Sequence, residues 1–349
     1  MTRIRTLVVE DSLTVRKHLC EILGADPAFE VVGEAEDGKQ AIELCRLLRP
    51  DVVTLDMMLP VMSGLAATEY IMAYCATPIL IVSSSTNRGE LFKTYEALSA
   101  GAVEVMEKPK SDEPDGEWEA RFRAMVKLVS RVKVITHLRG RLPQARRRSN
   151  PSELPSARGE PQECRMVALG ASTGGPSAIV EVLRALPPEF SLPVLVVIHI
   201  GEPFGTAFAE WLDGQTMHRV CMAQDGQRVP DRGVFLAPPN RHLLVRNGRM
   251  YLNDDKERHS CRPSVDVLFE SLATEYQAAV AACLLTGMGA DGARGLLAIR
   301  QAGGLTIAQD EASSVVYGMP REAALLCAAK HVLPLVEIGA MLATLAHTA

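Results

Sequence analysis

The chain has 349 residues, of which 47% are hydrophobic and 23% are charged, and its formal net charge is −5. This length favours two domains over one, and the composition is that of a folded, soluble α/β protein rather than a disordered one. The negative charge balance gives no reason to expect nucleic acid as a partner.

Membrane insertion and secretion are not expected either. Apolar runs such as 195–198 are far shorter than a membrane-spanning helix needs, and residues 1–5 lead into a strand pattern without a signal-peptide core. The eight cysteines form no C-x-x-C pair and several lie in apolar surroundings, which favours reduced thiols over a disulfide or zinc framework. We therefore expect a cytoplasmic protein.

Residues 1–138 begin with an alternation of strand and helix patterns that is typical of a parallel α/β sheet. The expected strands are 6–9, 31–34, 52–55, 79–82 and 103–106, and helical patterns cover 15–23 and 39–48. Apolar residues from Trp118 to Val132 recur every three or four positions, which predicts one further helix. Residues 139–163 contain four prolines and the run Arg146-Arg147-Arg148, which indicates a flexible, basic linker. A second α/β alternation covers 164–349.

Five polar side chains follow the strands of the first domain at points that should share one sheet edge. Glu10 and Asp11 follow the first strand, Asp56 the third, Ser83 ends the fourth and Lys108 follows the fifth. Because ligands bind at the carboxyl ends of parallel strands, we expect these side chains to form one site. Carboxylates suit Mg²⁺, and the lysine would balance a phosphoryl group.

This set resembles the response-regulator receiver domain, which implies a flavodoxin-like fold with a five-stranded parallel sheet. The resemblance implies that Asp56 is the phosphoacceptor, that Ser83 is the switch hydroxyl, and that Lys108 contacts the phosphate. It also implies that Glu10, Asp11, Asp56 and the Met58 carbonyl surround Mg²⁺ when the domain is phosphorylated. Val105 stands where many receivers carry an aromatic switch residue, so the aromatic rotamer mechanism is not expected here.

The second domain opens with an apolar run, 166–169, followed by Gly170-Ala171-Ser172-Thr173-Gly174-Gly175 and a helical pattern. A serine at a strand-to-helix turn of the form G-x-S-x-G is typical of a hydrolase nucleophile. The glycine spacing fits neither a dinucleotide-binding turn nor a phosphate-binding loop.

A serine nucleophile needs a base and an orienting carboxylate. His199 closes the apolar strand 193–198 and should lie on the same sheet edge as Ser172. Two carboxylates compete for the third position, because Asp291 follows the run 279–285 and Asp310 follows 305–308.

Further motifs, namely Arg262-Pro263-Ser264-Val265-Asp266, Leu285-Thr286-Gly287-Met288-Gly289 and Gly318-Met319-Pro320-Arg321-Glu322, make the second domain similar to the catalytic domain of the chemotaxis-type protein-glutamate methylesterase, CheB. The resemblance implies a doubly wound α/β serine hydrolase in which Ser172 is the nucleophile, His199 the general base and acid, and Asp291 the orienting carboxylate. It implies an oxyanion hole at the Met288 amide, assisted by Thr173, and no cofactor for ester hydrolysis. Cys261 departs from the histidine of well-known members.

The sequence therefore predicts a phosphorylation-activated esterase that demethylates glutamate methyl esters, and also deamidates glutamines, on methyl-accepting chemoreceptors. A chemotaxis-type sensor histidine kinase would supply the phosphoryl group. Two alternatives stay open. The protein could be a phosphorylation-dependent docking protein with little hydrolase activity, or the same esterase could serve a non-chemotactic pathway.

Overall fold

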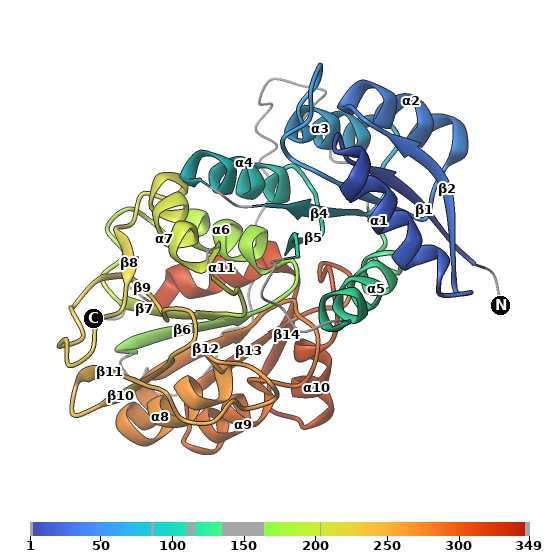
Figure 1. Ribbon diagram of the computed structural model, residues 1–349. Helices are drawn as coiled ribbons and strands as arrows, with labels where there is room; N and C mark the ends of the chain where they lie inside the picture. Colours follow the sequence, from blue (N-terminus) through green and yellow to red (C-terminus); the bar gives the residue numbers. More distant parts are fainter. Residues whose placement is uncertain (1–2, 85–86, 110–115, 135–163, 203, 346–349) are drawn as a thin grey trace.

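The computed structural model describes residues 3–84, 87–109, 116–134, 164–202 and 204–345, which form two α/β units (Figure 1). The first unit contains β1 (Ile4–Val9), α1 (Leu13–Gly24), β2 (Phe29–Ala35), α2 (Gly38–Leu48), β3 (Val52–Leu55), α3 (Gly64–Tyr74), β4 (Ile79–Ser83), α4 (Arg88–Ser99), β5 (Glu104–Glu107) and α5 (Glu117–Val129). Its strands form one parallel sheet in the order β2-β1-β3-β4-β5. This is the flavodoxin-like order, so the expected fold is confirmed.

Local sequence explains most element boundaries in this unit. Strand β3 is buried along its whole length, as expected for a central strand with helices on both faces. Ser12, Asp37, Ser63 and Asn87 cap the four helices α1 to α4 by accepting backbone N–H groups with their side chains. The expected strand ranges agree with the observed ones to within a few residues, and the linker predicted at 139–163 lies outside the described residues.

The second unit begins at β6 and contains a larger sheet. Its elements are β6 (Met166–Ala171), α6 (Gly175–Ala185), β7 (Pro193–Ile198), α7 (Phe204–Gln215), β8 (Val220–Met222), β9 (Gly233–Leu236), β10 (His242–Arg246), β11 (Arg249–Asn253), α8 (Val265–Tyr276), η2 (Gln277–Ala279), β12 (Val280–Leu284), α9 (Ala293–Gln301), β13 (Leu305–Gln309), α10 (Met319–Leu325), β14 (His331–Leu333) and α11 (Leu335–Ala343). Seven parallel strands lie in the order β14-β13-β12-β6-β7-β9-β8, and β10 and β11 form a separate antiparallel hairpin.

Side-chain alternation along the strands builds a core on each face of this sheet. In β6, Val167 and Leu169 belong to the core beneath α6, α7 and α11, whereas Met166 and Ala168 belong to the core beneath α8 and α9. The sheet is therefore doubly wound, as the sequence predicted. Strands β12, β6 and β7 are neighbours at its centre, so the loops that follow them meet at one edge.

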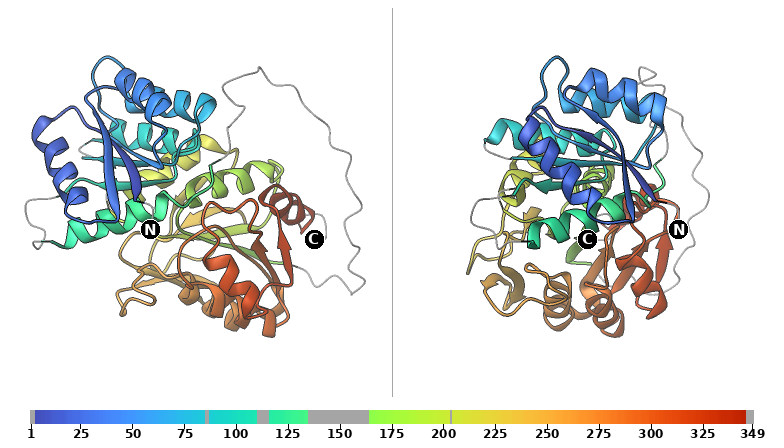
Figure 2. Two further views of the ribbon diagram at one scale, coloured as in Figure 1. Left: turned by 90° about the vertical axis from the view of Figure 1, so that its right-hand side faces the viewer. Right: turned by 45° about the vertical axis from the view of Figure 1, so that its right-hand side comes forward.

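An aromatic cluster joins the two units. Helix α4 packs against α6 and α7, as Figures 1 and 2 show. Tyr95 of α4 is fully buried, its ring lies 5.2 Å from those of both Phe208 and Trp211, and its hydroxyl donates to the Phe204 carbonyl at 2.5 Å. Because these aromatic side chains are removed from water, the contact contributes substantially to holding the units together.

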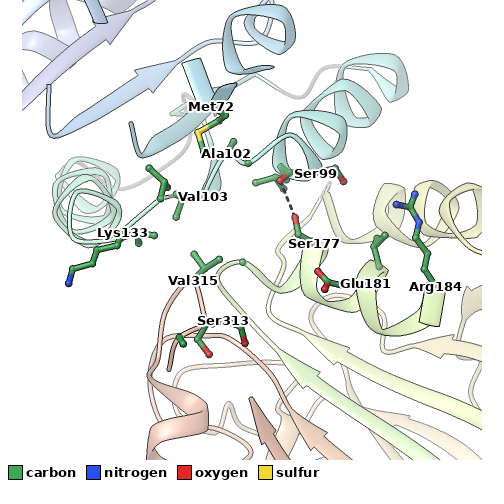
Figure 3. A pocket seen from close by; sticks show the side chains of 18 residues that line it. Met72, Ser99, Ala102, Val103, Lys133, Ser177, Glu181, Arg184, Ser313 and Val315 are labelled. Atoms are coloured by element: carbon green, nitrogen blue, oxygen red, sulfur yellow. Dashed lines mark hydrogen bonds between the residues drawn. The ribbon is translucent and has the colours of Figure 1, made fainter. Parts of the chain in front are cut away.

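Polar contacts and a cavity lie beside this aromatic cluster. The Ser177 hydroxyl donates to the Leu98 carbonyl at 3.0 Å, and Arg88 forms a 2.5 Å ion pair with Glu210. A cavity of about 480 Å³ separates other parts of the two units, and Figure 3 shows Ser177 and Val315 lining it from the second unit. The interface is thus closely packed around Tyr95 and looser toward Val315.

Candidate functional site

The structure brings the predicted polar side chains of the first unit together at the carboxyl ends of its strands. The Lys108 ammonium lies 3.0 Å from Asp56 Oδ2 and 2.7 Å from Glu10 Oε2. Asp56 Oδ1 accepts the Met57 amide at 2.7 Å. Oxygen atoms of Glu10, Asp11 and Asp56 all lie within 4.8 Å of one another. The three carboxylates therefore form an acidic cluster, and Lys108 contacts two of them.

Burial and neighbouring charges shift the pKa values of Glu10 and Lys108 in this acidic cluster. Burial raises the pKa of Glu10, an effect that the hydrogen bond from Lys108 opposes and the nearby charge of Asp56 reinforces. Burial by itself would lower the pKa of Lys108, but Glu10 and Asp56 outweigh it and raise that pKa. Crowded carboxylate oxygens are the donor set that Mg²⁺ prefers, so these residues fit the ion.

Ser83 and Met58 complete the predicted set. Ser83 ends β4, is fully buried, and its hydroxyl has no hydrogen-bond partner among the described residues. A buried hydroxyl without a partner is costly, and a phosphoryl oxygen would satisfy it. Met58 follows Asp56 in the same loop with its side chain partly exposed.

A tight turn after β6 presents Ser172. Its amide donates to the Thr286 carbonyl at 3.0 Å, which ties the turn to the loop after β12. Gly174 has φ +76° and starts α6, and a Cβ there would lie 2.6 Å from Val315. A Cβ on Gly287 would lie 2.8 Å from the Ser172 Cβ, so the two loops touch at this point. Both glycines are therefore required by close backbone approach.

His199 and Asp291 meet beside this turn. His199 directly follows β7, and its Nε2 lies 2.8 Å from Asp291 Oδ2. Burial by itself would lower the pKa of His199, but the hydrogen bonds to Asp291 and Cys261 outweigh it and raise the pKa to about 9. The imidazole is thus stabilised in its charged form in this state.

The buried Asp291 carboxylate is held by the start of helix α8. Its Oδ1 accepts the Ser264 hydroxyl at 2.7 Å and the Asp266 amide at 3.1 Å, and its Oδ2 accepts the Val265 amide at 2.7 Å. Burial raises the pKa of Asp291, but these bonds and His199 outweigh it, so the pKa is lowered. The positive end of the helix dipole acts in the same direction.

The rival carboxylate, Asp310, has a different role. Its Oδ1 accepts both the amide and the hydroxyl of Ser313, at 2.9 and 2.6 Å, which closes a turn after β13. The geometry therefore joins Asp291, and not Asp310, to His199.

The second ring nitrogen of His199 faces a thiol. Cys261 Sγ lies 3.6 Å from His199 Nδ1 and 3.3 Å from the His259 carbonyl. Within the described part of the chain, no hydrogen bond joins Ser172 Oγ to His199. The serine and the histidine share the sheet edge, but a thiol lies at the ring nitrogen that a serine nucleophile would need.

The predicted oxyanion residues lie in the two loops that touch. Thr173 is buried, and its carbonyl accepts the Thr286 hydroxyl at 2.9 Å. Met288 directly follows Gly287, with its side chain largely exposed. Thr173 directly follows Ser172 in the chain, and Met288 follows the glycine that approaches Ser172, so their role in an oxyanion hole stays a prediction.

The first unit reaches this same site through β5. The Glu104 side chain accepts the Val105 amide at 3.1 Å and lies near enough to the Thr173 side chain for Thr173 to affect its pKa. Burial raises the pKa of Glu104, an effect that the Val105 amide and the Thr173 side chain oppose. Sequence reasoning missed this contact and those of Ser264 and Tyr95, because they depend on how separate segments dock. The Arg-Pro-Ser-Val-Asp motif was the one signal that could have indicated Ser264.

Comparisons with known proteins agree with this arrangement. The family described as CheB methylesterase matches residues 167–342, and the response regulator receiver domain matches residues 6–114. A protein-glutamate methylesterase/protein-glutamine glutaminase of Geobacter metallireducens is 42% identical over 350 residues, covering 98% of this chain and 99% of that protein. A protein of the same name from Pseudomonas aeruginosa is 43% identical, covering 97% and 96%.

A solved structure gives the same result for the second unit. The CheB methylesterase catalytic domain of Thermotoga maritima has a TM-score of 0.50 and 34% identity, covering 52% of this chain and 98% of that one. Across the described ranges, the structure contains no helix with the length and apolar character needed to cross a membrane.

Proposed function

The chain belongs to the CheB methylesterase family, and from this premise we propose how its own residues carry out and control the hydrolysis of glutamate methyl esters. The enzyme is a protein-glutamate methylesterase whose receiver domain regulates it by phosphorylation. We assign Ser172 as the nucleophile, His199 as the base and Asp291 as the residue that orients it. The 2.8 Å contact between His199 and Asp291, beside the Ser172 turn, is the observation that carries this proposal.

The ring nitrogens of His199 have separate roles in this mechanism. Nε2 donates its proton to the ionised Asp291, so Nδ1 is the nitrogen that takes the Ser172 proton. Cys261 contacts Nδ1 in this state, so the thiol must move away before Ser172 can transfer its proton to Nδ1. Ser172 then attacks the ester carbonyl, and His199 passes the proton to the departing methanol.

The remaining steps use the loops around Ser172. We propose that the Met288 amide, assisted by Thr173, stabilises the negative charge on the carbonyl oxygen. One such donor typically lowers the barrier by about 3 kcal/mol. Water then hydrolyses the acyl-enzyme and leaves a free glutamate. The same steps on a glutamine side chain release ammonia, which accounts for the glutaminase activity in the relatives' names.

Control of the site comes from the receiver. Unphosphorylated, it packs on α6 and α7, and Glu104 reaches Thr173 beside the nucleophile. We propose that this contact keeps the substrate out. Phosphorylation of Asp56 replaces its single carboxylate charge with a phosphoryl group that carries about two negative charges beside Ser83 and Lys108, which biases the unit toward a form that releases the site. Glu10, Asp11, Asp56 and the Met58 carbonyl would hold Mg²⁺, which would supply positive charge to offset that of the phosphoryl group.

The domain limits and partners follow from the same premise. We propose a receiver over 1–138, a linker over 139–163 and a catalytic domain over 164–349. The substrates would be methyl-accepting chemoreceptors, the phosphodonor a chemotaxis-type histidine kinase, and the compartment the cytoplasm.

Ser172→Ala tests the assignment. We expect the phosphorylated variant to lose ester hydrolysis by at least about 10³-fold, because no other group replaces the nucleophile. The measurement is methanol release from methylated receptor fragments, with Asp56 phosphorylation as the check that the variant is folded.

Two outcomes of that experiment would point elsewhere. Methanol release at the wild-type rate by the variant would refute Ser172 as the nucleophile. Absence of methanol release from the phosphorylated wild-type protein would favour the alternative of a docking protein without hydrolase activity.

A further inference from the structure

Two cysteines of the receiver lie in contact, away from both sites described above. Cys45 lies in α2 and is buried, and Cys75 directly follows α3 and is partly exposed. Their sulfur atoms are 4.0 Å apart. The pair lies where both helices end, at the sheet edge opposite the one that carries Asp56. The proposed hydrolytic and phosphorylation chemistry uses neither thiol.

A short relay of hydrogen bonds connects the pair. The Thr77 hydroxyl donates to the Cys75 carbonyl at 2.8 Å, so it accepts from the Cys45 thiol, 3.4 Å away. The Cys75 thiol in turn donates to the Cys45 sulfur. The hydrogen bond from Cys75 lowers the pKa of Cys45 to about 7, an effect that burial opposes. Cys45 can therefore form a thiolate near neutral pH, and the Cys75 thiol lies directly beside it.

A cavity borders this pair of cysteines. It has a volume of about 510 Å³ and is lined by both cysteines, by Thr77, and by Arg46 and Arg49. Both arginines are exposed. Positive charge near a thiolate favours its formation, and a thiolate, not a thiol, is the form that reacts with oxidants.

We propose that Cys45 and Cys75 form a redox-active dithiol that hydrogen peroxide converts reversibly into a disulfide joining α2 to α3. The Cys45 thiolate attacks one peroxide oxygen, the O–O bond breaks, and hydroxide leaves, which gives a sulfenic acid on Cys45. The Cys75 sulfur then attacks the Cys45 sulfur, and the sulfenic oxygen leaves as water. In total, two thiols and one peroxide give one disulfide and two waters.

The local structure permits this change. The sulfur atoms must approach from 4.0 Å to about 2 Å to form the bond. Cys75 lies beyond the last residue of α3, so its adjustment does not break the helix. Other buried thiols of the chain differ, because burial in the apolar core raises the pKa values of Cys164 and Cys283.

The test uses the full-length wild-type protein and hydrogen peroxide. After brief oxidation and removal of peroxide, the protein is denatured and alkylated, and its peptides are analysed by mass spectrometry. We expect a peptide pair linked through Cys45 and Cys75 that dithiothreitol separates, while Cys283 remains alkylated. Full alkylation of Cys45 and Cys75, at a peroxide dose that oxidises the exposed Cys327, would overturn the proposal.

A variant separates the two chemical steps. In Cys75→Ser the second thiol is missing, so the sulfenic acid on Cys45 should persist and be captured by a dimedone probe. Cys20→Ser is the matched control and should still form the link. Phosphorylation of Asp56 verifies folding in both variants. If dimedone labels no Cys45 in folded Cys75→Ser, the assignment of Cys45 as the attacking thiolate is wrong.

Discussion

His199 has a partner at each ring nitrogen, and both partners raise its pKa. Asp291 at 2.8 Å and Cys261 at 3.6 Å both stabilise the protonated ring, against the effect of burial. A general base must be neutral to accept a proton. The resting site therefore holds His199, the proposed base, in its protonated form at neutral pH, and activity should increase as the pH approaches 9.

Replacement of Cys261 tests this interpretation. The Cys261 contact raises the pKa of His199, so Cys261→Ala should lower that pKa and move the half-maximal rate to lower pH. At pH 7 we expect kcat/KM to rise by about two- to tenfold, because a larger fraction of the base is neutral. The measurement is the pH profile of kcat/KM for the phosphorylated full chain.

Cys327→Ser, which changes an exposed thiol, is the control for general effects of removing a cysteine. An unchanged pH profile in Cys261→Ala would show that the thiol does not influence the base.

At the level of elements, the start of helix α8 provides the environment that keeps Asp291 ionised. Two backbone amides and the Ser264 hydroxyl converge on one buried carboxylate. Ser264 occupies the N-cap position of α8, but its side chain makes no hydrogen bond to the helix and donates to Asp291 instead. An element that would otherwise be structural therefore supports the orientation of the base.

Ser264→Ala should weaken this support without removing any proposed reacting group. A hydrogen bond to a charged group is worth about 1.5–3 kcal/mol, so we expect kcat to fall by roughly ten- to hundredfold with little change in KM. The measurement is kcat and KM for methanol release under phosphorylating conditions.

Thr274→Ala is the matched control, because Thr274 lies on the exposed side of the same helix and bonds only to the Glu270 carbonyl. Equal losses in the two variants would mean that Ser264 acts through helix stability alone.

The sequence predicted the residues that follow the strands, because their positions depend on strand order. It missed the contacts between separate segments, because these depend on how the segments dock. Ser172, His199 and Asp291 each follow an apolar run, and parallel strands bring such positions to one edge whatever the loops do. The choice between Asp291 and Asp310 could not be made from spacing, because each carboxylate follows a buried strand. The sequence could not assign a partner to Ser264, since a serine before a helix has the same pattern whichever group it bonds.

At the scale of the whole molecule, two domains with separate chemistries share one hydrophobic cluster. Tyr95 of the receiver packs against two aromatic residues of α7, and Glu104 lies near Thr173, which adjoins the proposed nucleophile. No pattern within either domain indicates these contacts, because each becomes visible only when the other domain is present. Under the proposed control by the receiver, the stability of this interface should set the basal activity of the enzyme.

Tyr95→Ala should therefore activate the unphosphorylated enzyme. Truncation of a buried aromatic anchor at an interface typically costs at least about 2 kcal/mol, which would raise the basal rate of methanol release by at least about tenfold. A fragment beginning near Cys164 lacks the receiver and should mark the upper limit of that rate.

Tyr95→Phe keeps the ring contacts but loses the hydrogen bond to the Phe204 carbonyl, so its rate should lie between wild type and Tyr95→Ala. Tyr70→Ala changes a receiver tyrosine on α3 whose ring contacts Tyr74 and, in the described part of the chain, none of the aromatic rings of α7, and it should leave the basal rate unchanged. If folded Tyr95→Ala hydrolyses ester no faster than wild type while the fragment is fast, the restraint lies in the Glu104 contact and not in the aromatic cluster.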